Sequence, residues 1–520
     1  MSKVSVSLPF GGRTLNTAVD HLVAEIQNLY QEDNTPWVVG YSGGKDSTAV
    51  LQLVWLALKG LPIEKRSKTV HVISTDTLVE NPIVASWVTS SLVTMERAAQ
   101  EQGIPIQPHR LTPEIKDTFW VNLAGKGYPA PRPKFRWCTD RLKIKPSNKF
   151  IKSQIKQYGE AILVLGTRKA ESSARAASMM KHEKGRMRDR LSPNGSLPGS
   201  LVYSPVEDWS NDDVWLFLMQ VANQWGYPNK DLLTMYQGAS ADGECPLVVD
   251  SSTPSCGDSR FGCWTCTLVE KDKSMTAMIQ NDEEKEWMLP LLELRNELDV
   301  VDDRPLRDFR RMAGNVTPFH DATVPGPYTQ DARENWLRKL LQAQEWVRTH
   351  GPDSTVDIEL ITIPELHEIR RIWVFEKHEI EDSLPRIYQE VTGREFPGRP
   401  LEENMVLASD DVEILKEICG DDRLHFEMTR SLVAVERSHR TMARRAGLYD
   451  QLEKSVRRAF YDSEQDATER ALELGRARNL RKGGLAAVKD DESPDDKSSP
   501  VPKEVSIEAN NIDSRLDHVL

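Results

Sequence analysis

The apolar positions of the first 220 residues fall alternately into short continuous runs and longer helical patterns. Apolar runs bounded by turn residues, at 37–41, 69–75 and 161–166, predict buried strands. In the stretches 47–58 and 83–102, the apolar residues recur with helical spacing instead, which predicts helices. This alternation predicts an α/β fold, a parallel sheet with helices on both faces, and ligands at the carboxyl ends of the strands.

Beyond about residue 274 the pattern changes to long helices rich in Arg and Glu, such as 331–348 and 366–379. The turn-rich stretch 191–200 predicts a mobile loop. The last forty residues are polar, charged and proline-bearing, which is typical of disorder. We therefore expect a sheet domain at 1–230, a Cys-rich segment at 231–273, a helical domain at 274–480 and a disordered acidic tail at 481–520.

Composition narrows the class of protein. The chain has 520 residues, of which 39% are hydrophobic and 28% are charged. No charge-free apolar run approaches the roughly 18 residues of a membrane span, and the N-terminus lacks the features of a signal peptide. Six cysteines are too few for a disulfide scaffold of this size. These features predict a cytoplasmic protein with no membrane contact.

The charge is unevenly distributed along the chain. The net charge is −12, yet the stretch Pro131–Leu191 carries 17 Lys and Arg against 5 Asp and Glu. That stretch is therefore at +12 and the remainder at −24. A basic concentration of this kind is a candidate binding surface for the phosphates of a nucleotide or a nucleic acid. A solvated basic face is the alternative.

The stretch "YSGGKDST", residues 41–48, lies between the first predicted strand and the first predicted helix. Successive backbone N–H groups and a helix N-terminus at such a position form an anion site. The glycines let the backbone approach the anion closely, and Lys45 adds a positive charge. The spacing differs from G-x-x-x-x-G-K-S/T, so this is not the phosphate loop of ordinary nucleoside triphosphatases.

Four cysteines crowd into 22 residues with the spacing C-x10-C-x6-C-x2-C, and the last two stand in "FGCWTC". Four thiolates suit either a tetrahedral zinc ion or an iron–sulfur cluster, and the spacing does not decide between them. The predicted metal ligands are Cys245, Cys256, Cys263 and Cys266.

The motif SGGKDS resembles the pyrophosphate-binding loop of the N-type ATP pyrophosphatases. "STDTLVENP", "GTRKAESSAR" and "SPVEDWSNDDVWLFL" are similar to stretches of the phosphoadenylylsulfate reductase branch of that superfamily, and together these motifs cover about residues 35–220. With "FRWCTDRLKIKP", the FGCWTC pair and the helical extension, the chain resembles the DndC-type sulfurtransferases of DNA phosphorothioation over most of its length.

This resemblance implies a fold like that of the adenine nucleotide alpha hydrolases and a reaction that replaces a non-bridging oxygen of a DNA backbone phosphate by sulfur. The implied cofactors are ATP, Mg2+ and a 4Fe-4S cluster. The implied partners are DNA, a cysteine desulfurase as sulfur donor and other DNA phosphorothioation subunits. The sequence does not indicate which DNA motif is modified.

The resemblance also gives roles to individual residues. Lys45, Asp46 and Cys138 are the expected catalytic residues, and Cys138 is a candidate persulfide carrier because Arg136, Arg141, Lys143 and Lys145 surround it. A structural thiol is the alternative for Cys138, and the cluster could hold the sulfur instead. The expected ATP-binding residues are Ser42, Gly43, Gly44, Lys45, Asp46, Ser47 and Asp76; the expected substrate-phosphate residues are Arg168, Glu171, Ser172 and Arg175.

Two departures from the reductase branch disfavour reduction of an activated sulfate. The Glu-Cys-Gly-Leu-His element of assimilatory reductases is missing, since Cys419 stands in "EICGDD" without a histidine. Cys138 also stands alone where cluster-bearing reductases show an adjacent cysteine pair. A tRNA thiolase of the same superfamily, a reductase-like enzyme and a catalytically idle scaffold subunit remain as alternatives.

Overall fold

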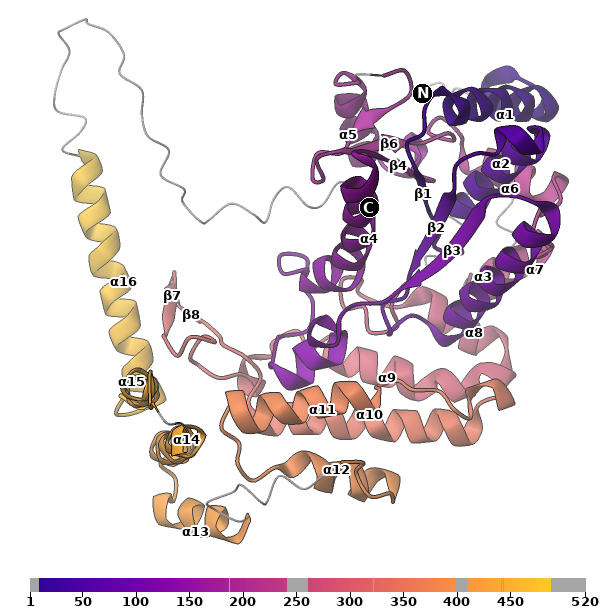
Figure 1. Cartoon of the computed structure of the whole chain (residues 1–520). Helices are drawn as coiled ribbons and strands as arrows, with labels where there is room; N and C mark the ends of the chain where they lie inside the picture. The colour runs from indigo at the N-terminus through magenta and orange to yellow at the C-terminus, as the bar shows by residue number, and fades with distance from the viewer. Residues whose placement is uncertain are drawn as a thin grey trace, which may run out of the picture.

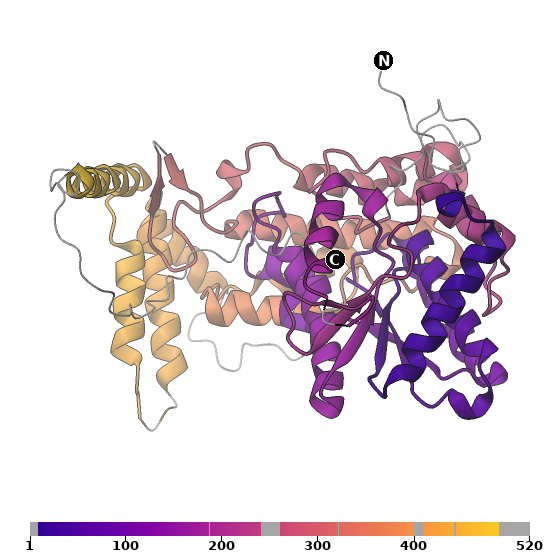
Figure 2. The ribbon, with the colours of Figure 1, turned by 90° about the horizontal axis from the view of Figure 1, so that it is seen from above.

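The computed structural model describes residues 9–186, 188–240, 261–320, 322–398, 409–440, 442 and 444–487, without the side chains of 409 and 479–487. Figure 1 shows a twisted sheet flanked by helices, a layer of long helices beneath it, and a group of C-terminal helices at one end. Seen from above, those C-terminal helices project from the end of the molecule (Figure 2).

Six strands form one sheet in the order β3-β2-β1-β4-β6-β5. Every neighbouring pair is parallel except β5 and β6, which are antiparallel. The predicted parallel sheet is therefore confirmed, and its three predicted strands are β1, β2 and β4. The strands are β1 (Trp37–Gly40), β2 (Val70–Thr75), β3 (Ile106–Leu111), β4 (Ala161–Val164), β5 (Ser192–Pro193) and β6 (Ser200–Tyr203).

The stretch 191–200 is a correction to the sequence analysis. It was expected to be a mobile loop, but Ser192 and Pro193 pair with Val202 and Leu201 at the edge of the sheet. Leu197 is 2% exposed and packs against the sheet, so burial of an apolar side chain anchors this turn-rich segment. Local turn residues do not reveal such long-range pairing.

Helices cover both faces of the sheet because side chains alternate along β1. Trp37 and Val39 belong to one buried core, and Val38 points to the opposite face, where it packs with Ile151 of α4. The first face is covered by α1 (Leu15–Glu32), α2 (Lys45–Gly60), α3 (Pro82–Gln102), α6 (Asn211–Gln220) and α7 (Asn229–Gly238); α4 (Lys145–Tyr158) covers the second, and α5 (Ser173–Glu183) follows β4.

A second core joins the helical layer to a segment that lies between β3 and α4 in the sequence. Trp120 and Trp137 of that segment are buried with Trp336 and Trp373 of the helical layer. The indole N–H of Trp373 donates to the carbonyl oxygen of Ala124 at 2.9 Å. The layer consists of α8 (Lys273–Asn281), α9 (Leu289–Leu298), α10 (Gln330–His350), α11 (Ile363–Arg371) and α12 (Ser383–Thr392).

The helices expected at 331–348 and 366–379 are α10 and α11, the latter continuing as a π-helical turn at Ile372–Glu376. Trp209 and Trp215, within the SPVEDWSNDDVWLFL motif, are 7% and 1% exposed and belong to the core. In the part of the chain that the structure describes, no helix is both long and apolar enough to cross a bilayer.

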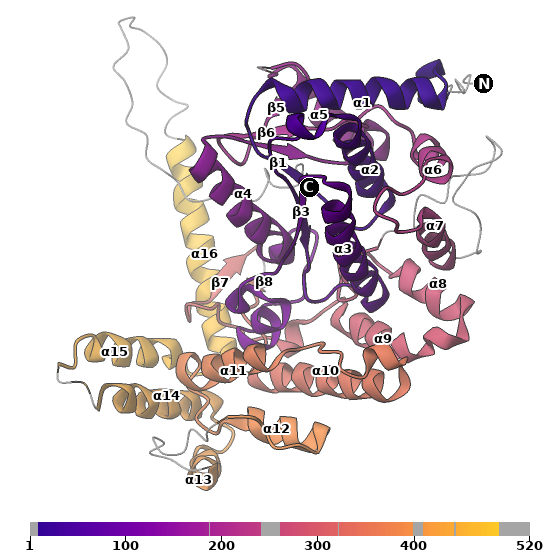
Figure 3. The ribbon, with the colours of Figure 1, turned by 45° about the vertical axis from the view of Figure 1, so that its right-hand side comes forward.

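Charged groups attach the C-terminal helices to the helical layer. Arg310 pairs with both Asp308 and Glu427, and Arg430 pairs with Glu381 at 2.6 Å. α14 and α15 lie side by side, and α16 packs against the hairpin of β7 and β8 (Figure 3). These elements are β7 (Thr317–Phe319), β8 (Ala322–Val324), α13 (Ser409–Cys419), α14 (Arg423–Arg440), α15 (Leu448–Ala459) and α16 (Glu464–Ala487).

The helix α16 extends into the tail that was expected to be disordered from 481, and the rest of that tail lies outside the described residues.

A buried ion pair in α10 gives a test of this packing. Arg333 is 3% exposed and makes a two-point ion pair with Glu379, which is 6% exposed. We expect Arg333→Ala to lower the free energy of unfolding by about 3–5 kcal/mol, because it leaves a buried carboxylate without its partner. Urea denaturation measures this. Arg338→Ala on the same helix is the control, since its pair with Glu390 is exposed and contributes about 1 kcal/mol or less. An equal loss of unfolding free energy in the two variants would contradict a special contribution of the buried Arg333–Glu379 pair.

Candidate functional site

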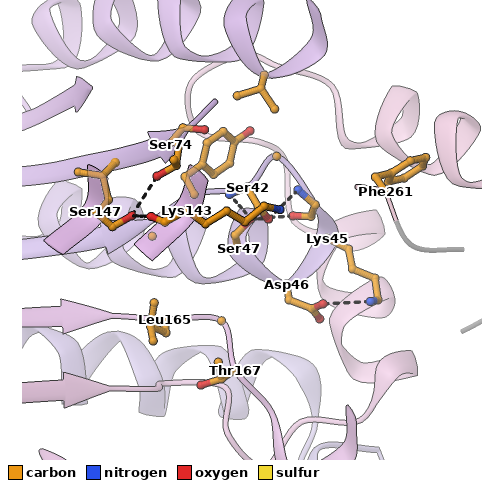
Figure 4. Close-up of a pocket in the computed structure, with 18 of the residues that line it drawn as sticks. Ser42, Lys45, Asp46, Ser47, Ser74, Lys143, Ser147, Leu165, Thr167 and Phe261 are labelled. Carbon is orange, nitrogen blue, oxygen red and sulfur yellow. Dashed lines mark hydrogen bonds and ion pairs between the residues drawn. The ribbon is translucent and has the colours of Figure 1, made fainter. Parts of the chain in front are cut away.

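A cavity of about 670 Å³ opens at the carboxyl edge of the sheet. It lies where the strand order reverses, because the chain leaves β1 toward one face and reaches the neighbouring β4 from the other. Residues that follow β1, β2 and β4 line it, together with the start of α4 and the end of α7. Figure 4 shows side chains of the loop after β1, of Lys143 and of Phe261 around this cavity.

The loop after β1 has the conformation that the sequence predicts for an anion site. Gly43 has φ +74°, and a Cβ at this position would lie 2.5 Å from a methyl carbon of Val88. Gly44 is the N-cap of α2 and has no side chain to cap the helix. The Ser42 and Ser47 hydroxyls are 3.1 Å apart, which braces the turn from within. A helix N-terminus without a side-chain cap is available to a phosphate group.

The loop after β4 packs directly against the loop after β1. A Cβ at Gly166 would lie 2.8 Å from the backbone carbonyl of Asp46 and 3.0 Å from the amide nitrogen of Ser47. Gly166 is the first residue of the "GTRKAESSAR" motif. Its lack of a side chain therefore lets two chain segments meet at the reversal of strand order.

Asp46 joins these two loops electrostatically. Its carboxylate accepts from the Lys45 ammonium at 3.0 Å and from Arg168 Nε at 2.7 Å. The side chain of Arg168 is almost fully buried and also donates to the carbonyl oxygen of Trp209 at 3.2 Å. Lys45 and Arg168 therefore already have a carboxylate partner, and an incoming phosphate group has to compete with Asp46 for both.

The cavity lining holds five cationic and four anionic side chains, and each carboxylate is paired with a cation. The lining therefore has a net charge of about +1, which is too small to attract a polyanion strongly. A polyanion binds well here only if its phosphates replace the carboxylates as partners of the cations. The other pairs are Asp76 with Arg110, Glu80 with Lys143 at 3.7 Å, and Glu171 with Arg175 at 2.8 Å.

The expected substrate-phosphate residues make contacts within the protein. Glu171 accepts from the backbone N–H of Arg168 at 2.8 Å and pairs with Arg175. Ser172 is the N-cap of α5 and accepts from the backbone N–H of Arg175 at 3.2 Å. Glu171 and Arg175 line the cavity together with Arg168. Their role toward a substrate stays a prediction.

The FGCWTC segment reaches the same edge of the sheet by backbone pairing. Cys263 forms a β-bridge with Glu80, and the backbone N–H of Trp264 donates to Val79 at 2.9 Å. The Cys263 sulfur lies 3.3 Å from the Thr77 hydroxyl and 3.8 Å from a carboxylate oxygen of Glu80. Because Glu80 lines the cavity, the Cys263 thiol stands directly behind its wall.

Aromatic contacts connect this segment to the loop after β1. The rings of Phe261 and Tyr236 meet edge to face with centroids 4.7 Å apart. The Tyr236 hydroxyl in turn accepts from the backbone N–H of Lys45 at 3.4 Å. Burial raises the pKa of the Tyr236 phenol, so this hydroxyl stays protonated at physiological pH.

The structure does not favour the thiolate of Cys138, and the expectation from its basic neighbours is wrong in this respect. Burial raises the pKa of the Cys138 thiol, and the charge of Lys143 lowers it by less. Arg141 and Lys145 are both directed to the carboxylate of Asp117 instead, at 3.4 and 3.2 Å. Proximity in the sequence therefore overstated the positive charge at this sulfur.

The predicted metal site lies partly outside the described residues, which include neither Cys245 nor Cys256. The backbone N–H of Cys266 donates to the carbonyl oxygen of Cys263 at 3.0 Å, and the nearby Cys266 contributes to the raised pKa of the Cys138 thiol. Within the described ranges, no three or more Cys, His, Asp or Glu side chains are arranged to hold a metal ion. The thiols of Cys263 and Cys266 are suitable ligands for a cluster, but two ligands alone do not form a complete site.

Several residues of the site were not among the predicted site residues, Arg110 beside Asp76 included. Glu80 and Lys143 stand within motifs that the sequence analysis quoted, and Phe261 begins FGCWTC, so their motifs carried a signal. Tyr236 stands in no such motif, because its contact with Lys45 depends on where α7 packs.

Gly43 offers a test of the loop geometry. We expect Gly43→Ala to cost about 1–3 kcal/mol of stability and to weaken ATP binding, because the new methyl group collides with Val88. Thermal unfolding and calorimetric titration with an ATP analogue measure both effects. Gly226→Ala is the control, since Gly226 has φ +78° but open space around its Cβ position. If both variants lose the same stability and keep their affinity for the ATP analogue, a collision with Val88 does not explain the need for glycine at position 43.

Comparison with known proteins finds a family model that matches the sheet region. Residues 36–268 match the family model of the phosphoadenosine phosphosulfate reductase domain. An uncharacterized protein of Methanocaldococcus jannaschii is 28% identical over 195 residues, which are 38% of this chain and 34% of that protein. The match thus spans about a third of that relative's length.

Solved structures similar to this chain share little sequence with it. Phosphoadenylyl-sulfate reductase of Candida auris is 14% identical, covers 39% of this chain and 84% of its own, and has a TM-score of 0.25. The tRNA thiolase NcsA of Methanococcus maripaludis, solved with its 4Fe-4S cluster, is 14% identical, covers 55% and 82%, and has a TM-score of 0.26. From the family match and the sheet described above, residues 36–268 form a phosphoadenosine phosphosulfate reductase-like domain.

Proposed function

We propose that this protein is an ATP pyrophosphatase and sulfurtransferase of DNA phosphorothioation, which adenylylates a backbone phosphate oxygen and enables its replacement by sulfur. The observation that carries the proposal is the shared cavity. The SGGKDS loop lines it, and Cys263 contacts Glu80 in its wall. A proposed cluster ligand therefore lies directly behind the wall of the cavity in which the nucleotide phosphates would bind.

In the first half-reaction, a non-bridging oxygen of a DNA phosphate attacks the α-phosphorus of ATP. A new P–O–P bond forms, the bond to the β-phosphate oxygen breaks, and pyrophosphate leaves with the electron pair. The backbone N–H groups at Gly44 and the Lys45 ammonium stabilise the charge that develops on pyrophosphate. Asp46 holds Lys45 and Arg168 in place until the phosphates replace it as their partner.

In the second half-reaction, a sulfur nucleophile attacks the activated DNA phosphorus. A P–S bond forms, the bond to the AMP oxygen breaks, and AMP leaves with the electron pair. If the sulfur is the outer atom of a cysteine persulfide, a thiol reductant then supplies two electrons to cleave the S–S bond. Cys138 is the proposed carrier, and its raised pKa means that a base must first take the proton of its thiol.

The proposed cofactors are ATP, Mg2+ and a 4Fe-4S cluster. Asp46, within the SGGKDS loop, is the carboxylate that would hold Mg2+ there. When bound by Cys245, Cys256, Cys263 and Cys266, the cluster would supply a second place to hold sulfur. DNA, a cysteine desulfurase and other phosphorothioation subunits are the proposed partners.

The family match itself favours one other candidate, a reductase of a sulfonated nucleotide. Such an enzyme would use the same cavity for the adenosine phosphosulfate group. The missing Glu-Cys-Gly-Leu-His element argues against it, since Cys419 lies on α13 without a neighbouring histidine.

Pyrophosphate release tests the proposal. With ATP, Mg2+ and duplex DNA, we expect the wild-type complex with its partner subunits to release pyrophosphate, and Lys45→Ala to lower the rate about 100-fold or more, because charge on the leaving group loses its partner. Lys59→Ala, at the exposed end of α2, is the control. Unchanged turnover in Lys45→Ala would refute the loop assignment. Thio-nucleosides in tRNA, in place of phosphorothioate dinucleotides in DNA, would indicate the thiolase alternative.

Metal content tests the cysteine assignment separately. Anaerobically purified protein should be brown and hold about four irons and four sulfides per chain. Cys263→Ser should lose this chromophore, whereas Cys419→Ser on α13 should keep it. A colourless protein with about one zinc per chain would make the four cysteines structural.

A further inference from the structure

The helix α4 carries a row of lysines along one exposed face. Lys145, Lys149, Lys152 and Lys156 follow one another at intervals of four, three and four residues, and all four are exposed. At about 100° per residue these positions fall within a sector of about 60°. We call these four residues the α4 lysine row.

The outer half of the α4 lysine row has no acidic partners. Lys145 pairs with Asp117 at 3.2 Å, and Lys149 pairs with Glu114 at 2.9 Å. Throughout the ranges that the structure describes, neither Lys152 nor Lys156 forms an ion pair. The positive charge that a ligand meets therefore increases along α4 away from the cavity.

The α4 lysine row begins at the rim of the cavity. Ile144, the N-cap of α4, and Ser147, Asn148 and Ile151 in the first half of α4 line the cavity. On a helical projection the row lies about 120° around the helix from these positions. The helix itself covers the face of the sheet opposite α2 and α3 (Figures 1 and 3). A ligand lying along the row would thus lead directly to the cavity.

We propose that the α4 lysine row binds the phosphodiester backbone of DNA on one side of the phosphate that enters the cavity. This inference rests on the proposed function. With a rise of 1.5 Å per residue, the row spans about 16 Å, which is the length of about five phosphates along one strand. A polymer substrate requires such a surface, because the phosphates next to the reacting one extend beyond the cavity. A free nucleotide requires no such surface.

The side chains around the row favour DNA over a lipid surface. Helices that lie on membranes combine lysines with large apolar side chains that enter the lipid. On α4, which the structure describes throughout, Tyr158 is the single large apolar side chain that is exposed. On the helical projection Tyr158 lies about 150° around α4 from the middle of the row, so no exposed large apolar side chain of α4 accompanies the lysines.

The test compares two double variants of the full chain that remove equal charge from opposite faces of the sheet. The first is Lys152→Gln with Lys156→Gln, neither of which belongs to the cavity. The control is Lys59→Gln with Lys65→Gln, exposed at the end of α2 and in the turn after it. Fluorescence anisotropy with a labelled 30-base-pair duplex, from 50 to 300 mM salt, measures affinity and its salt dependence.

We expect the first variant to bind DNA about tenfold more weakly and to lower the slope of log K against log salt by about 1.8, which corresponds to two lost phosphate contacts. The control should match the wild type. Equal affinity and slope in all three proteins would overturn the inference. Loss of binding to phosphatidylserine vesicles with DNA binding unchanged would also overturn it, in favour of a lipid surface.

The outcome separates this inference from the proposed function. If the first variant binds DNA more weakly than the wild type but the wild-type complex releases no DNA-dependent pyrophosphate, the role of the α4 lysine row is supported and the proposed reaction is contradicted. If pyrophosphate release occurs and the first variant binds DNA like the wild type, only the row fails. Weaker binding of RNA of the same length, with DNA unaffected, would overturn the assignment to DNA.

Discussion

The candidate site depends on the position of β1 at the middle of the sheet, between β2 and β4. The chain leaves β1 toward the face of α2 and returns to β4 from the face of α4, so the strand order reverses between these strands and a cavity opens at their carboxyl ends. Close packing then limits which residues the loops accept. Gly43 avoids Val88, and Gly166 lies against the backbone of Asp46.

The second determinant is the backbone pairing that brings the cysteine segment to this cavity. The bridge between Glu80 and Cys263 connects the end of β2 to a segment far away in the sequence. The contact of Phe261 with Tyr236 then links the same segment to the amide of Lys45. The SGGKDS loop and the Cys263 thiol are therefore held by one set of contacts, which supports the proposed sulfur transfer.

Charge in the cavity is balanced locally. Asp46 neutralises Lys45 and Arg168, and each of the other carboxylates in the lining has its own cation. In the proposed function, a polyphosphate binds here by exchange of partners, and the carboxylates hold the cations in place until it does. The α4 lysine row differs in this respect, since Lys152 and Lys156 have no partner among the described residues to exchange and are available to an extended polyanion.

The sequence by itself determined the features that depend on neighbouring residues: the apolar strands β1, β2 and β4, the glycine-rich anion loop at 42–47 and the long helix α10. Tertiary structure decided what depends on distant partners. It paired Ser192 and Pro193 with β6, placed Trp120 and Trp137 in the helical core, and directed Arg141 and Lys145 to Asp117 and away from Cys138. The physical reason is that turn and helix signals are local, whereas burial and charge pairing are set by segments that meet only in the fold.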